Sequence, residues 1–398
     1  MKSERAAFAI LVTAGVVVIS AALGIRQTFG LFAQPLAAHQ GITIGQLALA
    51  IAIQNLMWGI AQPFAGALSD RYGPGAVVAA SAALYALGLG GTALHPTVAT
   101  VFLGLGILVG LGQAGMTFAV VISAVSKAAP LPRRALAVAL AAAGGSLGQV
   151  AFVPLAQIVI DLAGFERSLL VLALLVIGVA PFGFLLARNR ARSSEGAAAA
   201  IAPWPAMVAA LREPGYLFLT GGFFACGFNL AFVTTHLPVY LSVCHISANV
   251  SAGALATVGF FNVIGSYGFG RLSDRLPPQL LLTALYAARA TAILTFALVP
   301  PTVASTMVFS VLMGLTWLGT VPLTNSVIMR LFGVGNLGVL FGACFVSHQI
   351  GAFLGVWGGG IAYEFFHSYQ PMWTIEIAVS FGAALLNVPI RLPVQARA

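Results

Sequence analysis

Long apolar stretches alternate with short polar or charged connections along the whole chain. Each stretch reaches the roughly 20 residues that a helix needs to cross a bilayer. Their approximate limits are 7–36, 44–67, 75–94, 98–125, 135–162, 168–187, 215–243, 249–270, 278–299, 303–329, 336–366 and 371–391. A lipid-exposed backbone must satisfy its own hydrogen bonds, and no stretch alternates in the way that a barrel strand does. The pattern therefore predicts an all-α membrane protein with twelve transmembrane helices.

The composition supports this prediction. Hydrophobic residues make up 60% of the 398 residues and charged residues only 7%, with a mean hydropathy of +1.01. A soluble domain carries about 25% charged residues. The 45 glycines suit close helix–helix contacts in a membrane. Cys226, Cys244 and Cys344 lie in or beside apolar stretches without metal-ligand spacing. We expect them to be small core residues, with no metal site and no disulfide framework.

Basic residues are distributed unevenly between the two sides of the predicted membrane. All Lys and Arg residues except Arg26, Arg167 and Arg289 fall in termini, connections or segment edges on one side. Basic loops mark the cytoplasmic side, so the pattern predicts a multi-pass protein of the inner (cytoplasmic) membrane with both termini cytoplasmic. The formal net charge of +9 is spread over separate loops facing anionic lipid. We therefore expect lipid as a partner and no nucleic acid.

One connection, residues 188–214, is longer and more polar than the others and falls near the middle of the chain. It contains four arginines and a Pro-Trp-Pro triplet at 203–205. We interpret it as a cytoplasmic linker between two pseudo-symmetric halves of six helices, 1–187 and 215–398. Parallel repeats of this kind hold a substrate site between them near the middle of the bilayer.

A short motif occurs once in each half. Residues 66–73 read GALSDRYG and residues 270–275 read GRLSDR, 270 − 66 = 204 positions later. A Gly-x-Leu-Ser-Asp-Arg turn between two apolar spans resembles the loop signature of the major facilitator superfamily, and its duplication at half-chain spacing makes the resemblance specific. The resemblance implies the major facilitator fold and a secondary transporter that works by alternating access.

The charged residues of this motif are candidates for a gate. Asp70 and Asp274 are placed to accept hydrogen bonds from N–H groups at the start of a neighbouring helix. Arg71 and Arg275 are placed to pair with carboxylates or lipid headgroups. Such contacts would hold the cytoplasmic side closed and break as the halves move. The alternative is a plain charged turn between two helices.

The chain shows no sign of chemical catalysis. It contains no nucleophile–base–acid trio, no metal cluster and no nucleotide-binding loop. We therefore predict that the protein is not an enzyme, needs no cofactor and is not driven by ATP.

Two arginines fall inside predicted spans. Arg26 lies in the first span and Arg289 near the centre of the ninth, neither with an acidic residue at the same depth. An intramembrane arginine usually faces a cavity or a partner because burying its charge costs on the order of 3 kcal/mol or more. An unmatched positive charge suits an anionic substrate, and its planar fork suits a carboxylate. The alternative for both residues is a structural bond to helix-end carbonyls.

Other polar residues in the spans are further candidates for substrate contact. His348 and Gln349 lie in the middle of the eleventh span, and His236 lies before Pro238 in the seventh. A histidine carries a proton near neutral pH or donates to a carboxylate, whereas the alternative is a hydrogen-bonded packing residue. Asn229, Gln113 and Trp317 complete the predicted substrate-binding set by helix number alone, with Asn55, Thr320 and Asn325 as further polar candidates.

Three segments resemble bacterial relatives of the monocarboxylate and oxalate–formate transporters. They are GIRQTFGLF in the first span, TTHLPVYL in the seventh and SHQIGAFLGVW in the eleventh. The resemblance implies transport of a small organic anion, a monocarboxylate, with a proton as coupling ion or by exchange, by a monomer. One position departs from the pattern: in the eighth span Asn262 matches, but Ser266 stands where these transporters have an arginine. Arg26 or Arg289 would have to supply that charge.

The alternative function is proton-coupled efflux of drugs or other amphiphiles. Such exporters carry a Gly-Pro pair in the fifth span and often a membrane-buried acid. The fifth span here has Gly144-Gly145 and, later, Val153-Pro154, which is not that pair.

Overall fold

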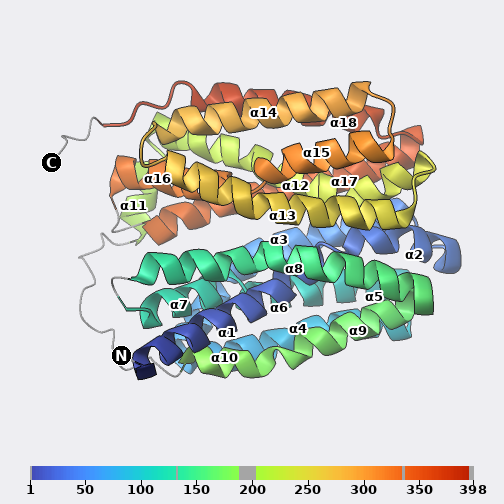
Figure 1. Ribbon diagram of the computed structural model, residues 1–398, viewed down its shortest axis with the longest axis horizontal. Coiled ribbons are helices and arrows are strands. Elements are labelled where there is room, and N and C mark those ends of the chain that lie inside the picture. Colours follow the sequence, from blue (N-terminus) through green and yellow to red (C-terminus); the bar gives the residue numbers. More distant parts are fainter. Residues whose placement is uncertain (1, 131–132, 188–202, 334–336, 394–398) are drawn as a thin grey trace.

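The computed structural model describes residues 2–130, 133–187, 203–333 and 337–393, and all regular structure in these ranges is helical (Figure 1). The elements of the first part are α1 (Lys2–Arg26), the 3₁₀ turn η1 (Phe29–Phe32), α2 (Ala33–Gln40), α3 (Ile44–Tyr72), α4 (Pro74–Leu94), α5 (Val98–Thr100), the π-helical η2 (Val101–Leu108), α6 (Val109–Gly115), the π-helical η3 (Phe118–Ile122), α7 (Ser123–Ala128), α8 (Arg134–Ala163), α9 (Phe165–Gly178) and α10 (Ala180–Ala187). Those of the second part are α11 (Pro203–Ala210), α12 (Pro214–Val243), α13 (Ala248–Leu272), α14 (Pro278–Leu298), α15 (Val303–Leu315), α16 (Thr320–Phe332), α17 (Leu337–Phe366) and α18 (Gln370–Asn387).

The predicted all-α membrane architecture is confirmed. Among the described residues, 11 helical stretches are long and apolar enough to cross a membrane. Some of these stretches join consecutive short helices, such as Val98–Ala128, which runs from α5 to α7. The twelfth predicted span, 371–391, is present as α18, which is 18 residues long and less apolar because it contains Glu376 and ends in polar residues.

The helices lie in two groups, one above the other in Figure 1. Helices of residues 2–187 run from blue to green, and we call them the N-terminal bundle. Those of residues 203–393 run from yellow-green to red, and we call them the C-terminal bundle. The two bundles contact each other through α3 with α17, α8 with α13, and η1 with α12. The larger part of the predicted linker, residues 188–202, lies outside the described residues, so the domain limits stay a prediction.

The two ends of the molecule carry different parts of the chain. α1 begins at the end where the described chain also finishes, and we call this the terminal end (Figure 1). α2 lies at the opposite end, which we call the α2 end.

Helices α3, α5 and α15 each begin with a capping box. In each box, Thr43, Thr97 or Thr302 accepts a hydrogen bond from a backbone N–H, and the side chain three residues later bonds back to the backbone of that threonine. These polar pairs fix where the three helices start.

Two spans are interrupted at corresponding places in the two bundles. The fourth span breaks between α6 and η3, and the tenth between α15 and α16. Side chains of neighbouring helices satisfy the freed backbone groups: Ala119 N donates to Gln62 Oε1 (3.1 Å), and Leu318 N donates to Asn262 Oδ1 (2.9 Å). Arg289 Nη2 donates to the carbonyl oxygens of Thr316 and Trp317. Irregular backbone at membrane depth is tolerated where protein surrounds it in this way. The apolar pattern of the sequence does not reveal either break.

Candidate functional site

Arg26, the last residue of α1, lies where the two bundles meet. Its Nη2 donates a hydrogen bond to Asn55 Oδ1 on α3, and its guanidinium carbon lies 5.5 Å from the ring centre of Trp58. Its Nε is buried and has no hydrogen-bond partner in the described part of the chain. The carbonyl end of a helix favours a cation, which explains how α1 accommodates this charge at its end. Arg26 thus has donor capacity left for an anion.

Asn55 also receives a bond from the other bundle. Gln349 Nε2 on α17 donates to the backbone oxygen of Asn55 (2.7 Å), and Gln349 Oε1 lies 3.0 Å from His348 Nδ1. Asn55 is fully buried and therefore connects Arg26 with Gln349 across the contact between the bundles. We name Arg26, Asn55, Gln349 and His348 the junction cluster. Of the predicted substrate ligands, the structure brings Arg26, His348 and Gln349 together in this cluster.

Aromatic rings from both bundles border the junction cluster. Trp58 lies 5.1 Å from Phe345 of α17 and 6.2 Å from Phe118 of η3, measured between ring centres. His348 stacks on Phe345 at 5.6 Å with an angle of 9° between the rings. Trp58 Nε1 is satisfied by Thr117 Oγ1 (2.9 Å), so its ring is held in place from within its own bundle. The cationic end of Arg26 therefore has an apolar wall beside it.

The remaining predicted ligands lie elsewhere. Gln113 is fully buried inside the N-terminal bundle and accepts from Gln54 (3.2 Å). Trp317 is 1% exposed, and its carbonyl is bound by the fully buried Arg289 (2.8 Å). The structural alternative for Arg289, a bond to helix-end carbonyls, is thus present. Substrate contact by these three residues stays a prediction.

His236 and Asn229 lie on α12 but take part in contacts within the C-terminal bundle. The two ring nitrogens of His236 contact the hydroxyl of Tyr369 (Nδ1, 3.1 Å) and the carbonyl oxygen of Val356 (Nε2, 2.8 Å). Asn229 donates to the Glu376 carboxyl on α18. All these polar atoms are buried, so neither side chain belongs to the junction cluster.

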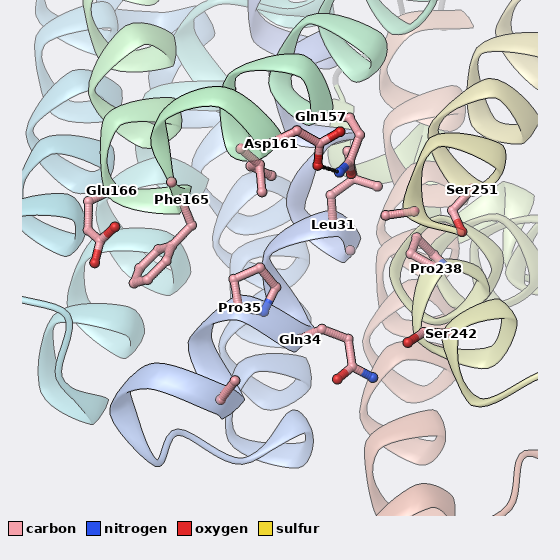
Figure 2. A pocket seen from close by; sticks show the side chains of 15 residues that line it. Leu31, Gln34, Pro35, Gln157, Asp161, Phe165, Glu166, Pro238, Ser242 and Ser251 are labelled. Carbon is pink, nitrogen blue, oxygen red and sulfur yellow. Dashed lines mark hydrogen bonds between the residues drawn. The ribbon is translucent and has the colours of Figure 1, made fainter. Parts of the chain in front are cut away.

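A pocket of about 560 Å³ opens between the two bundles towards the α2 end (Figure 2). Gln34, Gln157 and Asp161 line it from the N-terminal bundle, and Ser242 and Ser251 line it from the C-terminal bundle. Gln157 Nε2 donates to Asp161 Oδ1 at 2.7 Å, drawn as a dashed line in Figure 2. The sequence did not predict this pocket, because its residues come from the ends of separate apolar stretches.

Comparison with known proteins identifies the family. The family model described as "Major Facilitator Superfamily" matches residues 8–356. The chain belongs to the Major Facilitator Superfamily. It is 23% identical over 340 residues to the uncharacterized MFS-type transporter YhjX of Escherichia coli, covering 85% of this chain and 84% of the relative. It is 26% identical over 376 residues to monocarboxylate transporter 13 of Rattus norvegicus, covering 93% of this chain and 85% of the relative.

Solved structures confirm the fold. A bacterial homologue of the human lysosomal transporter Spinster, in an inward-facing and unoccupied conformation, superposes with a TM-score of 0.72. The alignment covers 96% of this chain and 95% of that chain at 14% sequence identity. The predicted fold is therefore confirmed, and the family match confirms the predicted superfamily: the chain is a multi-pass transporter of it.

The motif residues of this transporter lie at the terminal end and contact their own bundles. Asp70 and Lys127 form a salt bridge of 2.6 Å, both side chains being well exposed. Arg271 lies 3.8 Å from Asp274, and Arg330 donates to the carbonyl of Ser273 (3.1 Å). In the N-terminal bundle, Lys127 near the end of the fourth span thus contacts the motif that follows the second span. In the C-terminal bundle, Arg330 near the end of the tenth span contacts the motif that follows the eighth. The guanidinium of Arg71 lies over the ring of Tyr72 at 5.1 Å, and the gating role of Asp70, Arg71, Asp274 and Arg275 stays a prediction.

Reversing the charge of Asp70 tests this gate. We expect Asp70→Lys to slow transport about fivefold or more, a typical coupling between conformational states. Folding should be nearly unaffected, because an exposed salt bridge contributes less than about 1 kcal/mol. Exchanging both charges, as Asp70→Lys with Lys127→Asp, should restore transport, measured as initial uptake rate at equal surface expression. Unchanged uptake by the single variant would contradict the gating role.

At the α2 end, a polar contact crosses between the bundles. Thr43, which caps α3, donates its hydroxyl to the Glu364 carboxylate of α17. The carboxylate lies over the start of α3, since a Cβ added at Gly45 would be 2.3 Å from Glu364 Oε1. The amino end of a helix stabilises a negative charge, so Glu364 is held there by both the hydroxyl and the helix. This contact has to break if the bundles separate at the α2 end.

We expect Glu364→Ala to increase separation of the bundles at the α2 end. Ala48, one turn into α3, is 1% exposed and packs towards Gly360. In a Cys244→Ser background, an Ala48→Cys probe should react with a membrane-impermeant maleimide about fivefold faster or more when Glu364 is Ala. Glu364→Gln keeps an acceptor for Thr43 and should change the rate less. Equal rates for Glu364→Ala and the parent would contradict this prediction.

Trp58 is a site residue that the sequence did not predict. It lies three residues after Asn55, so the two side chains share a face of α3. The sequence feature that indicates Trp58 is a polar residue and a tryptophan three positions apart in a helix that lines the cavity. Among the described residues, no group of three His, Cys, Asp or Glu side chains is placed to hold a metal ion.

Proposed function

We propose that this Major Facilitator Superfamily protein is a secondary active transporter of a small organic anion, a monocarboxylate. The observation that carries the proposal is the Arg26 guanidinium at the contact between the bundles, with a buried Nε that has no partner in the described part of the chain. A carboxylate binds a guanidinium through two parallel hydrogen bonds. The similarity to monocarboxylate transporter 13 supports the same substrate class.

The junction cluster suggests how binding leads to movement. Arg26 now donates to the side chain of Asn55, whose backbone oxygen accepts from Gln349 of the other bundle. A carboxylate that takes over the Arg26 donors releases the Asn55 side chain at the contact between α3 and α17. His348, beside Gln349, is placed to donate to the same anion or to carry a proton. Alternating access then follows from rocking of the two bundles about this cluster.

The transporter works as a monomer in the inner (cytoplasmic) membrane with both termini in the cytoplasm, as the distribution of basic loops indicates. The α2 end then faces outward and the terminal end inward. Uptake is coupled to a proton or proceeds by exchange of anions.

A ligand panel tests the proposal. The purified protein is heated with formate, oxalate, pyruvate and lactate, and separately with tetraphenylphosphonium as a hydrophobic cation. A ligand that binds only the folded state raises the melting temperature by mass action. We expect stabilisation by at least one carboxylate, followed by uptake of that carboxylate into proteoliposomes. Stabilisation by the cation alone would overturn the proposal and favour efflux of amphiphiles.

A further inference from the structure

One face of α18 combines burial with polar chemistry. Tyr369 precedes the helix, and Glu376, Ser380 and Asn387 follow on the same side, all 2% exposed or less. Their spacing of seven, four and seven residues keeps them on one helical face. This face packs against α12 and α14, within the C-terminal bundle. The proposed transport site does not use it.

Glu376 is the acidic group on this face. It is 0% exposed, one carboxyl oxygen accepts from Asn229 Nδ2 of α12, and Asn229 Oδ1 accepts from Ser380 (3.0 Å). Its second oxygen, Oε1, is buried without a hydrogen-bond partner in the described part of the chain. Burying an ionised carboxylate without a paired cation is strongly unfavourable. The neutral acid is therefore the form that fits this arrangement, and Oε1 is where its proton can lie without displacing Asn229.

A buried cation lies on a helix packed against α18. Arg289 of α14 is 0% exposed, and its Nη2 donates to two carbonyls at the break of the tenth span. Its Nε and Nη1 are buried and have no partner among the described residues. Within the same residues, Glu376 and Arg289 form no salt bridge. The two groups therefore lie on helices that pack against each other but are not paired in this state.

Other titratable side chains surround this region. Those on the helices packed against α18 are Tyr216, Cys226, His236 and Tyr240 on α12, Tyr286 and Arg289 on α14, and Cys344, His348, Tyr363 and Glu364 on α17. Arg289 is the group among them that carries a permanent positive charge. It is therefore the partner that would stabilise an ionised Glu376.

The geometry points to Glu376 as a proton-binding site of the C-terminal bundle, holding a proton in the state described here and releasing it when Arg289 or water reaches the carboxyl. Proton release is a single step: the O–H bond at Glu376 breaks, the proton passes to water, and the carboxylate remains. This inference rests on the proposed function in one respect, because it identifies Glu376 as the residue that binds the coupling proton of that transporter.

α12 connects this proton site to the contact between the bundles. Asn229 holds Glu376 from the middle of α12, and the carbonyls of Thr234 and Thr235 lie against Gly30 of η1. A Cβ added at Gly30 would be 2.5 Å from the Thr234 oxygen, so the backbones of η1 and α12 are in direct contact. Gly30 comes four residues after Arg26. A change in the Glu376–Asn229 bond therefore reaches the segment that positions Arg26.

A polar pair lies between this site and the α2 end. His236 is two turns after Asn229 on α12, about 10 Å along the helix, and its Nδ1 lies 3.1 Å from the hydroxyl of Tyr369. Tyr369 directly precedes α18. The pair lies on the α2 side of Glu376, where a proton exchanged with that end would pass it.

Infrared spectroscopy tests the proton site without any substrate. The full chain in lipid nanodiscs is titrated from roughly pH 5 to pH 10, a range that includes buried carboxyl groups. We expect a carboxylic-acid carbonyl band that disappears as pH rises, is absent in Glu376→Gln and persists in the control Glu364→Gln. Asn229→Asp, which places a second carboxyl beside Glu376, should move the transition to higher pH. An ionised Glu376 at every pH, or an acid band that no pH removes, would overturn the site.

Transport tests the coupling separately. In proteoliposomes with a carboxylate from the ligand panel, Glu376→Gln should keep anion exchange within about twofold and lose uphill uptake driven by a pH gradient. Uphill uptake equal to that of the parent overturns the coupling role. If the parent transports no carboxylate, the proposed substrate class fails, and the infrared titration still decides whether Glu376 binds a proton.

Discussion

Replacing Arg26 with Gln is expected to lower carboxylate uptake on the order of 100-fold. A hydrogen bond to a charged group contributes about 1.5–3 kcal/mol, and a bidentate carboxylate loses two of them. Gln keeps the apolar stem of the side chain but is too short to reach Asn55, so that bond is lost while the packing of α1 on α8 should survive. The loss should appear as a missing thermal shift with the carboxylate and as loss of uptake, at normal expression and melting temperature.

Two further variants make this result specific. Arg26→Lys keeps the charge but not the planar fork, so it should retain only part of the uptake. Arg167→Gln removes an exposed arginine near the pocket end of α9 and should leave uptake unchanged. Preserved uptake in Arg26→Gln would remove Arg26 from the substrate site and leave it a structural residue.

Replacing Gly227 with Ala is expected to destabilise the folded protein by more than about 3 kcal/mol. A Cβ at Gly227 would lie 1.8 Å from the carbonyl oxygen of His348, and α12 and α17 would have to move apart. Overpacking commonly costs about 1–3 kcal/mol, and here the obstacle is backbone rather than a flexible side chain. The change should be measured as a lower melting temperature and a smaller folded fraction on size-exclusion chromatography.

Gly382→Ala is the matched control. It lies in α18, and a Cβ there meets nothing within 4 Å. Because Ala favours a helix interior over Gly by about 1 kcal/mol, this variant should be unchanged or slightly more stable. The changes in melting temperature caused by the two Gly→Ala substitutions should therefore differ in sign. Equal melting temperatures for both variants would contradict the close packing of α12 on α17.

The sequence predicted the architecture because the membrane leaves a chain few alternatives. Every span must satisfy its own backbone and present an apolar surface to lipid, so each helix is visible as an apolar stretch of sufficient length. The repeated Gly-x-Leu-Ser-Asp-Arg motif then indicated the superfamily, which the family model confirmed. Neither inference depends on which helices are in contact. Both depend on features that are local in the sequence.

The breaks in the fourth and tenth spans are different, because their cause lies on other helices. At the first break, Gln62 of α3 accepts from Ala119 N, and the Thr117 hydroxyl, which Trp58 holds, donates to the carbonyl of Gln113. The second break depends on Arg289 and Asn262 in the same way. The apolar pattern around each break is unremarkable, so it gave no signal.

What the sequence determined by itself is the class of protein: an all-α transporter of this superfamily with a short set of intramembrane polar residues. Only the tertiary structure decided which of those residues meet. Arg26 and Gln349 join through Asn55 between the bundles, whereas Asn229 pairs with Glu376 inside one of them. The reason is physical. Apolar length is a property of each segment, but a buried polar group is defined by its partner, and the partner is chosen by how helices distant in the sequence pack.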